Sequence, residues 1–254
     1  MQRLAIFGGT FDPIHWGHLL IAQTALHQVP LQQVIWVPSQ NPPHKQAALF
    51  EHRSEMVQRA IADNPGFTVS LVDKSRGASY AIDTLIDLSA DYPNTHWYWI
   101  VGLDTFQTLP RWYRGQELAQ LCDWLIAPRL PGGENIAQSE LICKQVEQKL
   151  RKQTASIQWH LLHIPLVGLS SSLIRNLCRN PSEGNRFLGD GSERPLSPSD
   201  TLRAERTRQQ DLRDGQSPPF PAERYANGDR QSIRYLVPEA VRLYIDNHNL
   251  YRNG

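Results

Sequence analysis

The residues of this chain best suited to chemistry lie near its N-terminus, in the run Gly8-Gly9-Thr10-Phe11-Asp12-Pro13-Ile14-His15-Trp16-Gly17-His18. Gly8 and Gly9 lack a Cβ atom, so a phosphate group can approach their backbone closely. His15 and His18 are three residues apart and would share one face of a helix, where their imidazoles can donate hydrogen bonds to phosphate oxygens. The N-terminus of that helix adds N–H donors and a partial positive charge. The run therefore indicates a phosphate-binding site.

Two plainer interpretations of this run stay open. Glycine and aspartate at the start of a helix are common in simple turns, and two histidines at this spacing can ligate a metal ion. Turns alone do not call for paired histidines beside paired glycines, and no cysteine or Glu-x-x-His pair stands nearby to complete a metal site. The commoner phosphate loops, G-x-G-x-x-G after the first strand and G-x-x-x-x-G-K-S/T, do not occur. Their absence argues against an oxidoreductase and a P-loop kinase.

Six short, continuous apolar runs are typical of parallel strands covered on both faces. They lie at residues 4–7, 34–37, 67–72, 97–101, 123–127 and 159–164. Helical patterns separate them at residues 15–27, 54–62, 80–88 and 135–152, and the third should bury Ile82, Leu85, Ile86 and Leu88. This alternation predicts right-handed βαβ units, and so an α/β fold with a doubly wound parallel sheet, rather than an α+β domain with an antiparallel sheet. Ligands of such sheets bind at the carboxyl ends of the strands, where Gly8 lies.

One segment does not follow this pattern. Residues 180–226 contain 10 apolar residues among 47, with 15 charged residues and six of the chain's 18 prolines. A segment of this composition cannot bury enough surface to offset its ordering entropy. We therefore expect a single domain made of residues 1–179 and 227–254, interrupted by a disordered polar insertion at 180–226. Pro238 should open the C-terminal helix, with Val241, Tyr244 and Ile245 on its inner face.

Composition excludes several classes of function. Lys+Arg 26 against Asp+Glu 25 gives the 254 residues a net charge of +1, so no overall field attracts nucleic acid or an anionic membrane. We expect no signal peptide and no membrane helix, since no apolar run approaches ~20 residues. The three cysteines are scattered and odd in number, which argues against a disulfide framework. The expected protein is cytoplasmic, and the sequence leaves open whether it forms a homo-oligomer.

A second motif, Leu169-Ser170-Ser171-Ser172-Leu173-Ile174-Arg175, follows the last predicted strand. Its hydroxyls can cap a helix or bond a phosphate, and Arg175 adds a fixed positive charge. An arginine on an amphipathic helix is more often a solvated surface residue, but the serines just upstream favour a functional one. Together with the H-x-G-H element of the first run, this motif resembles the two signatures of the nucleotidylyltransferase superfamily. The second signature usually reads Ile-Ser-Ser-Thr-x-x-Arg.

The middle and the end of the chain narrow this resemblance. The further motifs are, in order, Asn41-Pro42-Pro43-His44-Lys45, Ser79-Tyr80-Ala81-Ile82-Asp83-Thr84-Leu85, Gly102-Leu103-Asp104, Leu109-Pro110-Arg111-Trp112-Tyr113, Ala127-Pro128-Arg129, Tyr235-Leu236-Val237-Pro238 and Asn249-Leu250-Tyr251. In this order they resemble the bacterial nicotinate mononucleotide adenylyltransferases, over about residues 1–179 and 227–254. The resemblance implies a Rossmann-like nucleotidyltransferase fold.

The resemblance also implies a reaction. The 5′-phosphate of nicotinate mononucleotide would attack the α-phosphorus of ATP, giving nicotinic acid adenine dinucleotide and pyrophosphate, a step of NAD biosynthesis. That nucleophile is already an anion at pH 7, so the work is positioning and neutralising charge rather than general-base catalysis. Mg²⁺ would arrive with ATP. The alternatives are nicotinamide mononucleotide or phosphopantetheine as acceptor, or a nucleotide-binding regulator without turnover.

Each motif residue acquires an expected role from the resemblance. The ATP phosphates would lie among the catalytic His15, His18, Lys45 and Arg175, and beside Gly8, Gly9, Thr10, Ser171 and Ser172. Gly102 and Asp104 would border the adenosine, and Tyr80, Ala81, Trp112 and Arg129 would hold the pyridine ring and its carboxylate. The family usually has Thr in place of Ala81, which is harmless only if that contact is made by the backbone. Structural alternatives are packing for Trp112, solvated charge for Lys45 and Arg129, and helix capping for Asp104.

Overall fold

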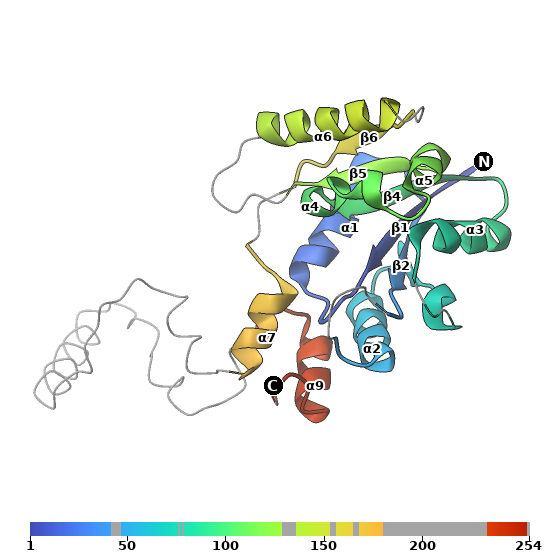
Figure 1. Ribbon diagram of the computed structural model, residues 1–254. Helices are drawn as coiled ribbons and strands as arrows, with labels where there is room; N and C mark the ends of the chain where they lie inside the picture. The colour runs from blue at the N-terminus through green and yellow to red at the C-terminus, as the bar shows by residue number, and fades with distance from the viewer. Residues whose placement is uncertain are drawn as a thin grey trace, which may run out of the picture.

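The computed structural model describes residues 1–41, 47–75, 77, 79–128, 136–152, 156–164, 168–179 and 233–252 (Figure 1). The strands of this part are β1 (Gln2–Gly9), β2 (Gln33–Pro38), β3 (Phe67–Val69), β4 (Thr95–Gly102), β5 (Asp123–Ala127) and β6 (Trp159–Leu161). The helices are α1 (Trp16–Gln28), α2 (Phe50–Ile61), α3 (Ala81–Asp91), α4 (Leu103–Phe106), α5 (Gly115–Leu121), α6 (Ile136–Arg151), α7 (Ser171–Arg179) and α9 (Glu239–Asn247), with 3-10 turns η1 (Val72–Ser75) and η2 (Leu109–Arg111).

The six strands form one sheet in the order β3-β2-β1-β4-β5-β6, and all the pairs between them are parallel. The chain therefore builds the sheet outward from β1 to β3, returns to the other side of β1, and builds outward again from β4 to β6. The direction in which successive strands are added to the sheet therefore reverses between β1 and β4. The predicted α/β fold with a doubly wound parallel sheet is confirmed.

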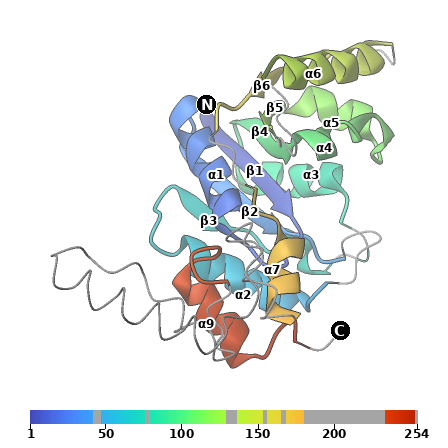
Figure 2. The ribbon, with the colours of Figure 1, turned by 90° about the vertical axis from the view of Figure 1, so that its left-hand side faces the viewer.

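Helices cover both faces of the sheet, and each face has its own apolar core. Along β1, Ala5 and Phe7 point into one core, while Leu4 and Ile6 point into the other. The first core is completed by α1, α2, α7 and α9, and the second by α3, α4, α5 and α6. Figure 2 shows α1 on one side of the sheet and α3 to α6 on the other. Burial on both faces explains the continuous apolar runs in β1, β2, β4 and β5, whereas the edge strands β3 and β6 are less buried and include polar residues.

Several local expectations are wrong in detail. The sixth strand ends at Leu161 and not at residue 164, and α2 begins at Phe50 and not at residue 54. The third strand ends at Val69 and not at residue 72, because the Ser70 hydroxyl accepts a hydrogen bond from the Val72 N–H at 3.3 Å and the chain turns into η1. In α3, Ile86 is 45% exposed, although the other three predicted apolar positions are buried. Ile86 follows the buried Leu85 directly, so it lies about 100° further round the helix.

The last helix brings the C-terminal segment back to the carboxyl end of the sheet. Pro238 is the N-cap residue of α9, and Val241, Tyr244 and Ile245 are buried, as predicted. In Figures 1 and 2, α9 lies beside α7 and α2. The predicted insertion at residues 180–226 lies outside the described residues. The three cysteines are free thiols, and among the described helices none is long and apolar enough to cross a membrane.

Candidate functional site

The carboxyl ends of β1 and β4 meet where the sheet order reverses. Phe7 pairs with Ile100 in the parallel register, so Gly9 and Gly102, each two residues further on, end neighbouring strands side by side. The helices α1 and α4 begin shortly after these glycines. Doubly wound sheets bind their ligands at this switch point. Two of the predicted motifs therefore lie at one edge of the sheet.

Two stacked imidazoles stand at the start of α1. His15 is the N-cap residue and His18 is the third residue of the helix, and their ring centroids are 3.7 Å apart with an angle of 26° between the planes. The His15 N–H donates to Nδ1 of His18 over 3.3 Å. A neutral His18 therefore carries its proton on Nε2, which makes that atom a donor. The histidines share one face, as their spacing predicted, and His18 has a fixed orientation.

Two glycines of the first motif make room for aromatic rings. A Cβ atom on Gly9 would lie 2.8 Å from Cζ of Phe11, whose ring packs edge-on against His18 with centroids 5.2 Å apart. A Cβ atom on Gly17 would lie 3.0 Å from the His15 ring. Access of a phosphate to the glycine backbone stays a prediction. The structure gives Gly9 and Gly17 a further role, since the rings around His18 need the space.

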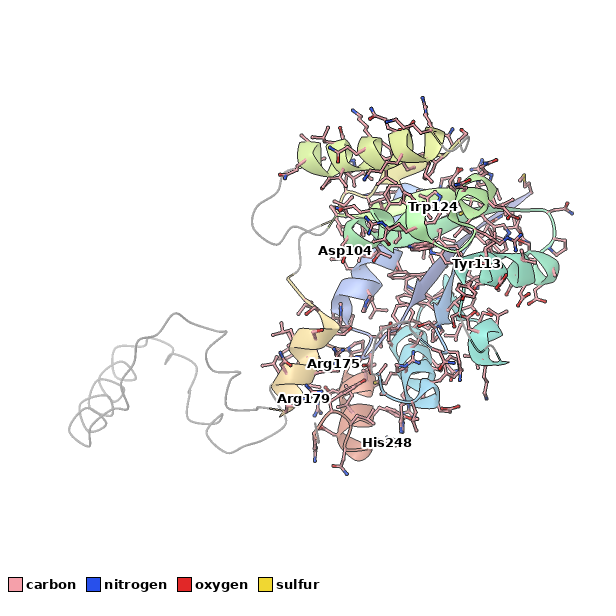
Figure 3. All side chains as sticks on the ribbon, viewed as in Figure 1. Asp104, Tyr113, Trp124, Arg175, Arg179 and His248 are labelled. Atoms are coloured by element: carbon pink, nitrogen blue, oxygen red, sulfur yellow. The ribbon has the colours of Figure 1, made fainter. Side chains whose placement is uncertain are left out.

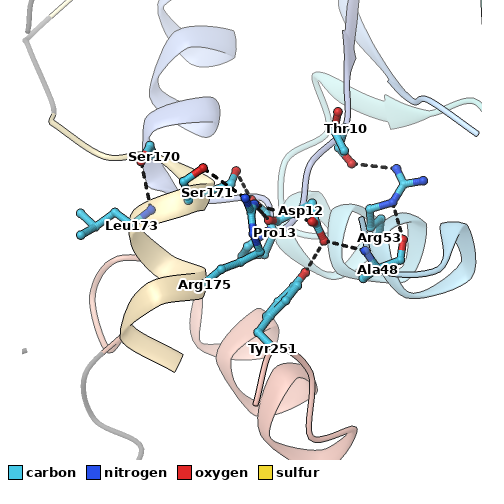
Figure 4. Close-up of polar contacts among 11 residues, drawn as sticks. Thr10, Asp12, Pro13, Ala48, Arg53, Ser170, Ser171, Leu173, Arg175 and Tyr251 are labelled. Carbon is cyan, nitrogen blue, oxygen red and sulfur yellow. Dashed lines mark hydrogen bonds and ion pairs between the residues drawn. The ribbon is translucent and has the colours of Figure 1, made fainter. Parts of the chain in front are cut away.

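The start of α7 is joined to the loop before α1 (Figure 4). The Ser170 hydroxyl accepts a hydrogen bond from the Leu173 N–H at 3.1 Å, which caps the helix. The Ser171 hydroxyl donates to the carbonyl oxygen of Pro13 at 2.9 Å. Two helix N-termini therefore converge here, and each contributes N–H groups without an intrahelical acceptor and a partial positive charge.

Arg175 reaches the same loop from the first turns of α7. Its Nη1 donates to the carbonyl oxygen of Asp12 at 2.6 Å and lies 3.6 Å from the Asp12 Oδ2, while its Nη2 donates to the Ser172 hydroxyl at 3.1 Å. The Arg175 side chain keeps 25% of its surface exposed, whereas that of Asp12 keeps 5%. Asp12 and Ser172 therefore fix the guanidinium, and a quarter of the Arg175 side chain stays open to solvent.

The carboxylate of Asp12 is buried and accepts hydrogen bonds from segments that are far apart in the sequence. Its Oδ1 accepts hydrogen bonds from the Tyr251 hydroxyl at 2.8 Å and from the Ala48 N–H at 3.2 Å (Figure 4). Burial raises the pKa of Tyr251, and the charge of Asp12 beside it raises this pKa further. Tyr251 is therefore a neutral donor at physiological pH. Asp12 links the C-terminal segment, the segment before α2 and Arg175.

A second cation, Arg53 of α2, contacts the same loops and, unlike Arg175, is buried at 1% exposure. Its Nε donates to the Ala48 carbonyl at 2.8 Å, its Nη1 to the Thr10 carbonyl at 2.8 Å, and its Nη2 to the Gln40 carbonyl at 3.1 Å. Burial lowers the pKa of Arg53, and the negative charge of Asp12 partly opposes that shift. The guanidinium therefore joins three backbone segments at once.

The predicted turn for the pyridine substrate lies at the start of α3. Tyr80 is the N-cap residue and Ala81 the first residue of this helix, at positions where backbone N–H groups lack an intrahelical acceptor. The Tyr80 ring packs against Tyr113 with centroids 4.5 Å apart, and the two residues are 44% and 56% exposed. An exposed aromatic pair therefore stands next to an N–H-rich helix start.

Trp112 is partly buried in the second core. Its ring meets Trp124 edge-on at 6.0 Å, and its Nε1 donates to the Thr108 hydroxyl at 2.9 Å. Trp112 therefore packs in the core, which was the structural alternative to a contact with the substrate. A contact between its remaining surface and a substrate stays a prediction.

Gly102 and Asp104 form a second small unit, at the end of β4. Gly102 is the N-cap residue of α4, and a Cβ atom there would lie 2.7 Å from Oδ1 of Asp104. The glycine therefore makes room for this carboxylate. Figure 3 shows Asp104 on the same side of the molecule as Arg175. The expected contact with adenosine stays a prediction.

The described structure thus brings most of the predicted phosphate-site residues together at the starts of α1 and α7. These residues are Gly8, Gly9, Thr10, His15, His18, Ser171, Ser172 and Arg175. Lys45 and Arg129 lie outside the described residues. Within the described part, no group of three or more His, Cys, Asp or Glu is placed to hold a metal ion.

Asp12, Arg53 and Tyr251 received no individual role from the sequence. A signal for Arg53 existed, because it lies three residues before Met56 and four before Val57, on the apolar stripe of α2. A charged residue on such a stripe is buried only if it is paired. The bond between Asp12 and Tyr251 spans 239 residues and leaves no local pattern.

The fold and this site define an α/β protein of the nucleotidyltransferase class, with histidines and an arginine at the switch point of a parallel sheet. A family model described as cytidylyltransferase-like matches residues 6–177, and the chain belongs to this family. A relative from Nostoc sp., named probable nicotinate-nucleotide adenylyltransferase, is 61% identical over 252 residues, which cover 99% of this chain and 98% of the relative. One of the same name from Synechococcus sp. is 37% identical, with 98% and 97% covered. The resemblance inferred from the motifs is confirmed.

Solved structures agree on the fold. The nicotinic acid mononucleotide adenylyltransferase of Plasmodium falciparum complexed with NaAD matches with a TM-score of 0.64 and 18% identity, covering 99% of this chain and 98% of that one. The same enzyme complexed with APC matches with a TM-score of 0.63.

Proposed function

We propose that the chain transfers the adenylyl group of ATP to nicotinate mononucleotide, forming nicotinic acid adenine dinucleotide and pyrophosphate in NAD biosynthesis, and that it does so in the cytoplasm. The observation that carries this proposal is the convergence of His15, His18 and Arg175 at the starts of α1 and α7, at the switch point of the sheet. The names of the full-length relatives support nicotinate mononucleotide as the acceptor.

The reaction needs positioning and charge neutralisation. A phosphate oxygen of nicotinate mononucleotide forms a bond to the α-phosphorus of ATP, and the bond from that phosphorus to the bridging oxygen breaks, so pyrophosphate leaves with the electron pair. Nε2 of His18 and the guanidinium of Arg175 would donate to phosphate oxygens on which charge develops. His15 would hold His18 and add a donor. Thr10, Ser171 and Ser172 would line the phosphates, together with Lys45 outside the described residues.

The donors at this site suit phosphate oxygens better than a bare metal ion. His18 and Arg175 present N–H groups, and the carboxylate of Asp12 is already engaged by Tyr251 and by Arg175. Mg²⁺ would therefore enter mainly on the oxygens of ATP itself, as it commonly does with nucleotide substrates. It would supply positive charge to the leaving pyrophosphate.

The acceptor would bind at the start of α3. Its carboxylate would accept hydrogen bonds from the backbone at Tyr80 and Ala81, because the first N–H groups of a helix lack intrahelical acceptors. Such a contact does not need the hydroxyl of a threonine, so Ala81 is compatible with the acid substrate. Trp112 would stack on the pyridine ring, and Arg129 would neutralise the acid. Gly102 and Asp104 would border the adenosine of ATP.

The test is pyrophosphate release from ATP and Mg²⁺ with each acceptor in parallel, and chromatography of the dinucleotide product. We expect faster turnover with nicotinate mononucleotide than with nicotinamide mononucleotide, and none with phosphopantetheine. A preference for nicotinamide mononucleotide would contradict the acceptor assignment. If no acceptor released pyrophosphate, the chain would be a nucleotide-binding regulator and the proposed reaction would be wrong.

A further inference from the structure

Arg53 is connected to both proposed substrate-binding regions, the loop before α1 and the turn before α3. Its guanidinium is buried and donates to the carbonyls of Thr10, Gln40 and Ala48. Hydrogen bonds from a charged donor are about twice as strong as those between neutral groups. Three such bonds to carbonyls of separate segments fix the positions of those segments relative to one another.

One of these carbonyls belongs to the ATP side. Thr10 directly follows Gly9, the last residue of β1, and begins the loop that leads to His15 and α1. Any displacement of the Thr10 carbonyl would therefore be carried along this loop to the histidines.

Another carbonyl leads to the acceptor side. Gln40 follows β2, and its N–H donates to the Ser79 hydroxyl at 3.1 Å. The side-chain amide of Asn41 donates through Nδ2 to the Gly77 carbonyl at 3.0 Å. Ser79 is the residue before Tyr80, the N-cap of α3. Arg53 is thus connected through Gln40 to the turn where the acceptor is proposed to bind.

We infer that Arg53 is a positioning residue that sets the spacing between the ATP-binding loop and the acceptor-binding turn. The inference rests on the proposed function. An in-line attack requires the reacting atoms to lie about 3–3.5 Å apart, and a displacement of ~1 Å can cost ~10²-fold in rate. Arginine suits this role because its planar guanidinium group directs several N–H groups at fixed angles, whereas lysine offers a single compact ammonium group. Being buried, Arg53 acts through the loops and not on the substrates.

The test compares Arg53→Lys with Arg59→Lys. Both arginines lie on α2, but Arg59 has an exposed side chain paired with Glu55. For each variant, turnover, the separate affinities for ATP and for nicotinate mononucleotide, and thermal unfolding are measured. In Arg53→Lys we expect kcat to fall ~10–100-fold while each substrate alone binds within about threefold of its wild-type affinity. Arg59→Lys should match the wild type.

The separate affinities distinguish positioning from a purely structural role. If Arg53→Lys kept its kcat within about twofold, or lost affinity for either substrate by the factor lost in kcat, the inference would be overturned. Should this variant fail to fold, Ser79→Ala decides, because it removes only the acceptor of the Gln40 N–H. We expect it to lower kcat by roughly 3–10-fold at unchanged separate affinities, and an unchanged kcat would overturn the inference. A wild-type chain without turnover would refute the proposed function itself, before any variant is compared.

Discussion

Removing the hydroxyl of Tyr251, which lies near the C-terminus, should destabilise the fold. The hydroxyl donates to Oδ1 of the buried Asp12 over 2.8 Å. Tyr251→Phe keeps the ring and deletes one oxygen atom, so the packing is retained. The carboxylate then loses one of the two hydrogen bonds to Oδ1, in a place where solvent cannot replace it.

The size of the effect follows from the charge on the acceptor. A hydrogen bond to a charged group contributes ~1.5–3 kcal/mol to the free energy of unfolding, more than one between neutral groups. In a domain of this size, each kcal/mol shifts Tm by about 2–4 °C. We therefore expect Tyr251→Phe to unfold about 3–12 °C below the wild type.

Urea unfolding followed by circular dichroism measures this loss directly. Tyr235→Phe is the matched control, because Tyr235 is 82% exposed and its loss of a hydroxyl should change the free energy of unfolding by less than ~0.5 kcal/mol. Equal effects of the two substitutions would show that the bond to Asp12 adds nothing. In that case the C-terminal segment would not stabilise the loop between β1 and α1 through Asp12.

The free energy of unfolding of the wild type should also decline above about pH 10, because the fold raises the pKa of Tyr251 from its usual 10.0. The stability that the neutral Tyr251 hydroxyl contributes is complete below pH 10 and is lost as the pH rises towards the pKa of the folded state. Urea titrations between about pH 9 and 11 should show a shallower decline for Tyr251→Phe, and parallel declines would count against this explanation. His18→Ala should lower kcat by roughly 10²–10³-fold with a much smaller change in substrate affinity, since its donor acts on charge that develops in the transition state; near-normal pyrophosphate release would remove His18 from the mechanism. Gly9→Ala should cost ~1–3 kcal/mol and slow turnover, because the new Cβ atom would lie 2.8 Å from Cζ of Phe11, whose ring supports His18. Unchanged unfolding and turnover in Gly9→Ala would show that the ring moves without consequence.

The elements of the fold could be predicted from the sequence because burial on both faces leaves a strong local pattern. In β1, both Ile6 and Phe7 are apolar, since each points into a core. The strand order is not local, and nothing in the apolar runs indicates that β1 and β4 are neighbours. The end of β3 was also missed, because Leu71 and Val72 are apolar although the strand has ended and the Val72 N–H donates to the Ser70 hydroxyl.

The site divides in the same way. His15, His18 and Arg175 could be proposed from the sequence because their residue types and spacing suggest their chemistry, and the structure brings them near one another. Tyr251 was missed as a partner of Asp12 because a bond across 239 residues has no sequence period. The carbonyl groups that Arg53 binds could not be predicted at all, since every residue has one and only the folded chain selects three of them.

The first motif combines two kinds of residue that the sequence does not distinguish. His15 and His18 lie at the start of α1 and are proposed as donors to the phosphates, whereas Phe11 and Asp12 are 2% and 4% exposed and belong to the buried support of the loop. Asp12 also holds Arg175, through its carbonyl oxygen at 2.6 Å and its carboxylate at 3.6 Å, so one residue both stabilises the fold and orients a proposed catalytic cation. Substitution of Phe11 or Asp12 should therefore lower stability and turnover together. Substitution of His18 should lower turnover far more than stability, since the fold loses mainly the contacts of one ring, among them those with His15 and Phe11. The two measurements, made on the same variants, separate the donors of the motif from their supports.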